Sequence, residues 1–172
     1  TELKIGNSVK KISSSTFMGC TGITGTLVIP DSVKEIDIEA FKGCTSITEL
    51  KIGNFVKKIS SSTFEGCTGI TGTLVIPDSV EEIDIESFKG CTSITELKIG
   101  NSVKKISSST FMGCTGITGT LVIPDSVEEI DTGAFKGCTD ITELTISDSV
   151  QTIGNQAFSG LYSLKTLNLG NG

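Results

Sequence analysis

The sequence repeats itself with a period of 47 residues, and this periodicity limits the fold more than any other feature. The segment Thr-Glu-Leu-Lys-Ile-Gly-Asn begins at Thr1, returns at Thr48 and Thr95, and recurs in altered form at Thr142. Residues 1–47 and 48–94 differ at only four positions, which are Ser8/Phe55, Met18/Glu65, Lys34/Glu81 and Ala40/Ser87. Such near-identity indicates a row of stacked, equivalent units.

Each unit contains a second, shorter period. The leading leucines fall at positions 3, 27, 50, 74, 97, 121, 144 and 167, so steps of 24 and 23 residues mostly alternate. The longer step contains Thr-Gly-Thr before the leucine, and a glycine at that point can absorb a bulge ahead of a strand. Seven repeats are complete and an eighth begins.

Each repeat has the same physical pattern. Leu-x-Ile predicts a short strand with alternate side chains directed inward. Gly-Asn or Pro-Asp-Ser supplies turn residues, and Val-x-x-Ile predicts a second extended segment or a tight turn. Residues 16–20 predict a helical or 3₁₀ turn. No repeat buries its apolar edge alone, so stacking must build columns of like residues. One column consists of Phe17, Phe41, Phe64, Phe88, Phe111, Phe135 and Phe158.

The pattern Leu27-Val28-Ile29-Pro30-Asp31-Ser32-Val33-x-x-Ile36, followed by Ala40-Phe41-x-Gly43-Cys44-x-x-Ile47, resembles the BspA-type leucine-rich repeat, also called the Treponema pallidum type. The resemblance covers essentially all of the chain. It implies a β-rich leucine-rich-repeat solenoid, right-handed and curved, with a parallel concave sheet, short 3₁₀ or helical turns and about seven full repeats of 23–24 residues. It also implies a cell-surface or secreted protein of a host-associated microbe, and several family members are adhesins.

The chain begins within the repeating pattern, so we interpret residues 1–172 as a single solenoid domain from a longer repeat array. The first repeat has the core pattern of an interior repeat, with nothing before it to cover its apolar edge. We therefore expect faster amide exchange in residues 1–23 than in repeats three to five. We also expect self-association through the uncapped ends.

Composition argues against most enzymes. Histidine is absent, which excludes Ser-His-Asp and Cys-His nucleophiles and histidine metal sites. A net charge of −6 disfavours nucleic-acid binding, and no run of eighteen apolar residues exists to span a membrane. We predict no catalytic residues, cofactor or metal.

Six cysteines occupy the same apolar position of successive repeats, at 20, 44, 67, 91, 114 and 138, and Leu161 fills that position in the seventh. A leucine there indicates a site for a hydrophobic side chain. Parallel stacking directs these side chains the same way, whereas a disulfide needs a specific torsion. We predict a ladder of buried, reduced thiols, which is compatible with an extracellular location because buried thiols are inert.

Two charged residues follow the valine of each repeat, and basic and acidic pairs alternate from Lys57-Lys58 to Glu128-Glu129. Opposite charges should therefore meet between neighbouring repeats. Each exposed pair contributes only about 0.2–1 kcal/mol, but a slip by one repeat would bring like charges together. Setting the register between repeats is therefore better supported than a role as a charged ligand-binding patch.

The residues that flank the inward Leu and Ile form the candidate binding surface on the concave face. They are Glu2, Lys4, Thr26, Val28, Glu49, Lys51, Thr73, Val75, Glu96, Lys98, Thr120 and Val122. This face is either a solvated sheet surface or a protein-binding surface. Phe55 is either an exposed aromatic contact or a packed turn residue.

Two functions follow. The first is an extracellular protein-binding module, an adhesin segment that binds host or matrix proteins. The second is a passive structural spacer in a longer surface protein.

Overall fold

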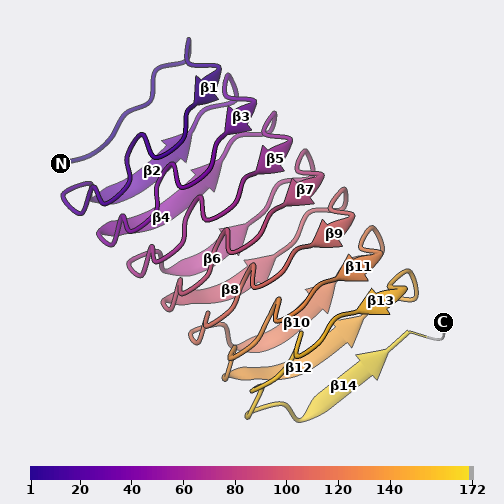
Figure 1. Ribbon diagram of the computed structural model, residues 1–172. Helices are drawn as coiled ribbons and strands as arrows, with labels where there is room; N and C mark the ends of the chain where they lie inside the picture. Colours follow the sequence, from indigo (N-terminus) through magenta and orange to yellow (C-terminus); the bar gives the residue numbers. More distant parts are fainter. Residues whose placement is uncertain (171–172) are drawn as a thin grey trace.

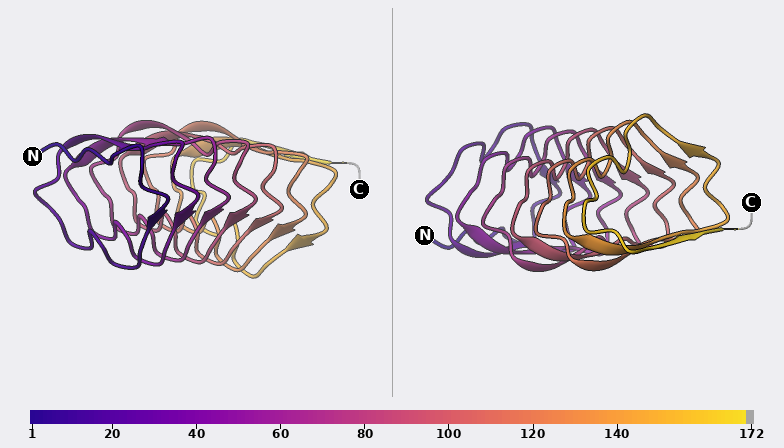
Figure 2. Two further views of the ribbon diagram at one scale, coloured as in Figure 1. Left: turned by 90° about the horizontal axis from the view of Figure 1, so that it is seen from above. Right: turned by 90° about the horizontal axis from the view of Figure 1, so that it is seen from below.

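The chain folds into a β-solenoid whose coils stack along one axis, with the two termini at opposite ends (Figures 1 and 2). The computed structural model describes residues 1–170. Each coil contributes a longer and a shorter strand. The longer strands are β2 (Gly25–Ile29), β4 (Ile47–Ile52), β6 (Gly72–Val75), β8 (Ile94–Lys98), β10 (Gly119–Ile123), β12 (Ile141–Ile146) and β14 (Thr166–Leu169). The shorter strands are β1 (Lys11–Ile12), β3 (Glu35–Ile36), β5 (Lys58–Ile59), β7 (Glu82–Ile83), β9 (Lys105–Ile106), β11 (Glu129–Ile130) and β13 (Thr152–Ile153).

The shorter strands form one continuous parallel sheet of seven strands in the order β1-β3-β5-β7-β9-β11-β13. Lys11 is opposite Glu35, and Ile12 is opposite Ile36. Of the two alternatives for Val-x-x-Ile, the extended segment is therefore the one that forms. The inward isoleucine of each coil lies on that of the coil before it.

The longer strands are parallel too, but their ladder is interrupted. β2 pairs with β4, β6 pairs with β8, and β12 lies between β10 and β14 and pairs with both. At the end of β14, the Gly170 amide donates to the Ile146 carbonyl of the preceding coil, 2.9 Å away. Pro77 and Pro124 occupy the equivalent position after β6 and β10. Proline has no amide hydrogen to donate, so each proline removes this bond to the preceding coil.

The extra residue of the longer step produces the expected bulge. The register between β2 and β4 shifts between Gly25 and Thr26, and Gly25 has a φ of +79°. The same shift occurs after Gly72 and Gly119. Proline and bulge lie on the same alternate coils, so the structural repeat is a pair of coils.

The helical or 3₁₀ turn expected at residues 16–20 is absent from the described chain, where consecutive turns take its place. Positive φ angles at Ser15 (54°) and Gly19 (68°) interrupt any helix. The amides alternate in their partners: Met18 donates to Ser15 within the coil, whereas Phe17 donates to the Ala40 carbonyl of the next coil. The amides of Ser15, Phe17 and Gly19 thus join neighbouring coils.

Stacked apolar columns form the core. Successive phenylalanine rings from Phe17 to Phe158 lie 5.2–5.5 Å apart between centroids and are nearly parallel. The predicted thiol ladder is also present: all six cysteines are free, and all except the half-buried Cys20 are buried. Each buried thiol donates to a phenylalanine carbonyl, as Cys67 does to Phe41 at 3.1 Å.

The end coils are less buried than the interior. Leu3, Val9 and Phe17 are only partly buried, whereas their interior equivalents are fully buried. At the other end β14 covers Leu144 and Ile146, which are 2% and 6% exposed. Asn171 and Gly172 lie outside the described residues.

Glycine 100 is expected to be intolerant of any side chain. A Cβ on Gly100 would lie 2.5 Å from the Pro77 carbonyl oxygen, while a Cβ on the equivalent Gly6 would meet nothing within 4 Å. We predict that Gly100→Ala lowers the free energy of unfolding by about 2–3 kcal/mol, as overpacking does. Gly6→Ala should change it by less than about 1 kcal/mol. Urea denaturation of both variants measures this, and equal losses would contradict the close stacking of Gly100 on Pro77.

Candidate functional site

The twelve candidate residues lie on one surface, which we call the long-strand face and define as the outward side chains of the longer strands and of Glu2 and Lys4. Lys4 pairs with Val28 through an isolated parallel bridge, and Val28 in turn is opposite Lys51. Two columns result. One alternates Glu with Thr and the other alternates Lys with Val, and Figure 1 shows the strands that carry them side by side.

Hydrogen bonds between coils organise the first column. The Thr26 hydroxyl donates to the Glu49 carboxylate at 2.6 Å, and Thr73 donates to Glu96 at 2.5 Å. The Thr26 hydroxyl, followed by the Lys51 ammonium 3.2 Å away, lowers the pKa of Glu49. The same two contacts, with Thr73 and Lys98, lower the pKa of Glu96, so both glutamates are ionised, paired with a lysine and held in place. This downward direction of the pKa of Glu49 and Glu96 is opposite to the one that a general acid needs.

The second column adds apolar area to this neutral surface. Val28, Val75 and Val122 are 47%, 50% and 52% exposed. Toward the carboxyl end Thr145 and Asn168 replace the Lys-Val alternation, and the Asn168 amide donates to Glu143 and Thr145. The arrangement offers a flat, mixed surface with a two-coil repeat, suited to contact with another macromolecule.

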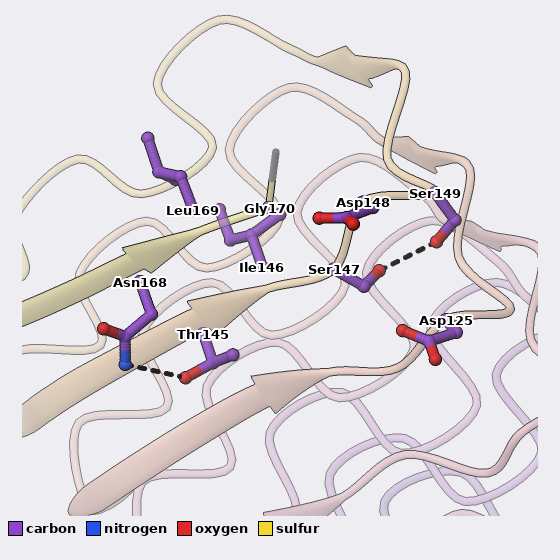
Figure 3. A pocket seen from close by; sticks show the side chains of 9 residues that line it. All are labelled: Asp125, Thr145, Ile146, Ser147, Asp148, Ser149, Asn168, Leu169 and Gly170. Carbon is purple, nitrogen blue, oxygen red and sulfur yellow. Dashed lines mark hydrogen bonds between the residues drawn. The ribbon is translucent and has the colours of Figure 1, made fainter. Parts of the chain in front are cut away.

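Shallow pockets recur where the longer strands end. One of about 550 Å³ lies at the ends of β12 and β14. Figure 3 shows the hydrogen bond between the Ser147 and Ser149 hydroxyls, which both line this pocket. Similar pockets of about 560 and 510 Å³ lie beside Asn54. Their linings are turn residues and strand ends, so they follow from the repeat itself.

The described chain, residues 1–170, contains no group of three or more Asp, Glu and Cys side chains placed to hold a metal ion. No helix in that part of the chain is long and apolar enough to cross a membrane.

The sheet of shorter strands carries the predicted alternation of charge. Lys58 contacts Glu82 at 2.8 Å and Asp84 at 3.0 Å. Equivalent triads centre on Lys11 and Lys105. These carboxylates raise the pKa of each central lysine. The pairing of opposite charges between neighbouring coils is confirmed.

Three surface features were not resolved or not recognised from the sequence. Phe55 is 58% exposed, so it is an exposed aromatic side chain and not a packed turn residue. Ile38 and Ile85 are each 52% exposed, although they follow Asp in an apolar-looking segment. The bond from Thr26 to Glu49 was also missed, and its signal was the alternation of Thr and Glu on successive coils.

A family model described as the BspA type leucine rich repeat region matches residues 1–118 and 70–172, with six copies of the repeat. The search of curated proteins found no match.

Solved structures share the fold. A leucine-rich repeat protein from T. pallidum is 28% identical, with a TM-score of 0.83 over 91% of this chain and 72% of that one. A leucine-rich cell surface protein from Faecalibacterium prausnitzii is 19% identical, with a TM-score of 0.52 over 95% of this chain and 70% of that one. The pneumococcal vaccine antigen PcpA is 16% identical, with a TM-score of 0.65 over 96% of this chain and 49% of that one.

Proposed function

Because this chain belongs to the BspA-type leucine-rich repeat family, we propose that it is an extracellular protein-binding module without enzymatic activity. In this proposal it forms an adhesin segment of a cell-surface or secreted microbial protein and binds host or matrix proteins. The similarity to a leucine-rich cell surface protein and a vaccine antigen supports the location. The long-strand face is the proposed contact surface, since solenoids commonly bind partners across an extended sheet face.

The observation that carries this proposal is the order of the long-strand face. Its glutamates are fixed by threonines and lysines before any partner arrives. A surface that is already ordered loses less conformational entropy on binding. The half-exposed valines supply apolar contact between these fixed polar groups.

Binding of the 172-residue chain to immobilised extracellular matrix tests this function. The triple variant Val28→Glu/Val75→Glu/Val122→Glu should bind at least about tenfold more weakly than the wild type. Ile38→Glu/Ile85→Glu is the matched control, because these residues are equally exposed but lie on another face. Equal loss in both variants, or in neither, would refute the long-strand face as the contact surface.

The second candidate is a passive spacer, and the near-identity of residues 1–47 and 48–94 favours it. Copies that remain alike have not become a specialised site. If the wild-type chain binds no matrix component while remaining folded, the spacer function is supported and the adhesin function fails.

A further inference from the structure

Few exposed positions depart from the repeat, and two of the departures lie together. The three two-coil units share lysine at positions 10, 57 and 104 but differ at the next coil, which carries Lys34 in the first unit and Glu81 and Glu128 in the others. Phe55 likewise replaces the serine found at Ser8 and Ser102. A third singular residue, Glu65, lies on the turn side, where it binds Lys42 at 3.0 Å.

Backbone hydrogen bonds place the lysines on adjacent coils. The Lys34 amide donates to the Lys10 carbonyl at 2.9 Å, and the Lys57 amide donates to the Lys34 carbonyl at 3.4 Å. All three side chains are exposed. The column thus presents three successive ammonium groups, whereas further along it alternates in sign.

Two of these lysines have no carboxylate partner among the described residues. Within residues 1–170, ion pairs hold Lys57 to Glu81 at 2.7 Å and Lys104 to Glu128 at 3.5 Å, but none involves Lys10 or Lys34. The neighbouring acids Glu35 and Asp37 are both bound by Lys11. Lys34 therefore leaves an excess of positive charge at this corner, on a chain of net charge −6.

Phe55 lies on the same side of the coil as this charge. Phe55 and Lys57 are both exposed, and they flank Val56, which is fully buried. The ring is 58% exposed. An exposed aromatic ring near the unpaired ammonium groups of Lys10 and Lys34 offers a partner both apolar area and positive charge.

We propose that Phe55 with Lys10, Lys34 and Lys57 forms a second interaction surface, which binds an acidic segment of a partner protein that also carries an apolar side chain. Lys10 and Lys34 pair with its carboxylates, and the ring contacts its apolar residue. An apolar contact favours a protein over a sulfated glycan, which offers mainly charge. This surface is separate from the long-strand face, so the two functions can fail independently.

The test uses the 172-residue chain and a fluorescein-labelled peptide, Glu-Glu-Leu-Glu-Phe-Glu-Glu, followed by fluorescence anisotropy at low ionic strength. Lys34→Glu and Phe55→Ser each restore the residue found in the other units, so both variants should fold as the wild type does. Each should weaken peptide binding about tenfold. The Val28→Glu/Val75→Glu/Val122→Glu variant should bind the peptide as tightly as the wild type.

A constructed second site provides the positive control. Glu81→Lys/Ser102→Phe reproduces the same residues one unit along the solenoid, with Lys57 common to both sets, so this variant should bind the peptide more tightly than the wild type does. The proposal is overturned if the wild type does not bind the peptide, if a glutamine version binds equally well, or if neither restoring variant weakens binding. It is also overturned if a heparin-derived oligosaccharide binds more tightly and loses affinity in Lys34→Glu but not in Phe55→Ser. Self-association that Lys34→Glu abolishes would identify a second copy as the partner and likewise reject it.

Discussion

Raising the pH from about 9 toward 12 is expected to unfold the chain, because its core contains a column of thiols. Burial raises the pKa of Cys67 and Cys138 from 9.0 to about 12, and it raises the pKa of Cys91 and Cys114 well above 9.0. The unfolded chain therefore releases these protons first. The stabilisation that comes from keeping these thiols protonated is fully present below the pKa of a thiol in the unfolded chain. It is lost as the pH rises toward the pKa of the thiols in the folded chain.

The expected size of this effect is large. Each pH unit in that window removes about 1.4 kcal/mol per buried thiol, so Cys67 alone accounts for about 4 kcal/mol. Several such thiols together match the stability of an ordinary domain, which is about 5–15 kcal/mol. The raised pKa values of Lys11, Lys58 and Lys105 act in the same direction.

Urea denaturation at pH values from 7 to 11 measures this dependence, and Cys67→Val tests its cause. Valine is close to cysteine in size and cannot ionise, so this variant should show a shallower decline above pH 9 by about 1.4 kcal/mol per unit. Thiol counting at pH 8 without reductant should find all six thiols after unfolding. Finding two or fewer would mean that disulfides have replaced the ladder.

Truncating a central ring of the phenylalanine column should also have a large effect. Phe88 is fully buried and stacks on both Phe64 and Phe111. Phe88→Ala removes both contacts and leaves a cavity, so we expect a loss of about 3–5 kcal/mol in the free energy of unfolding. Because each coil contacts only its neighbours, the variant should also unfold in two steps rather than one.

Phe17→Ala is the control for this experiment. Phe17 is partly buried and stacks on Phe41 alone, so its truncation should cost clearly less and leave a single transition. Circular dichroism during urea denaturation follows both variants. Similar losses at the two positions would show that the column does not couple the coils.

Periodicity sufficed to predict the columns, because stacking of equal units brings equal positions together. Phe17 to Phe158, the six thiols and the charge triads around Lys11, Lys58 and Lys105 all follow from this rule. The bulge after Gly25 was predictable for a similar reason, since one extra residue must be accommodated somewhere.

Features that depend on the contacts of individual atoms were not predictable. Turn residues 16–20 have helix-like spacing, yet Ser15 at positive φ directs alternate amides to the next coil. The interruption in the ladder of longer strands could not be predicted without knowing which carbonyl of the preceding coil faces Pro77. Candidate residues such as Thr26 and Glu49 could be assigned to a face, but their mutual hydrogen bond depends on side-chain reach.

Coils with Pro-Asp in the turn after the longer strand alternate with coils that have Gly-Asn there. This alternation limits how many coils the array can gain or lose. Removing residues 48–94 would join coils that already fit, because each Gly-Asn coil would still lie on a Pro-Asp coil. Removing residues 72–94 alone would set Lys57-Lys58 against Lys104-Lys105 and place two glycine turns in contact. The length of the solenoid therefore has a parity, and only even numbers of coils can be gained or lost without creating a new kind of junction.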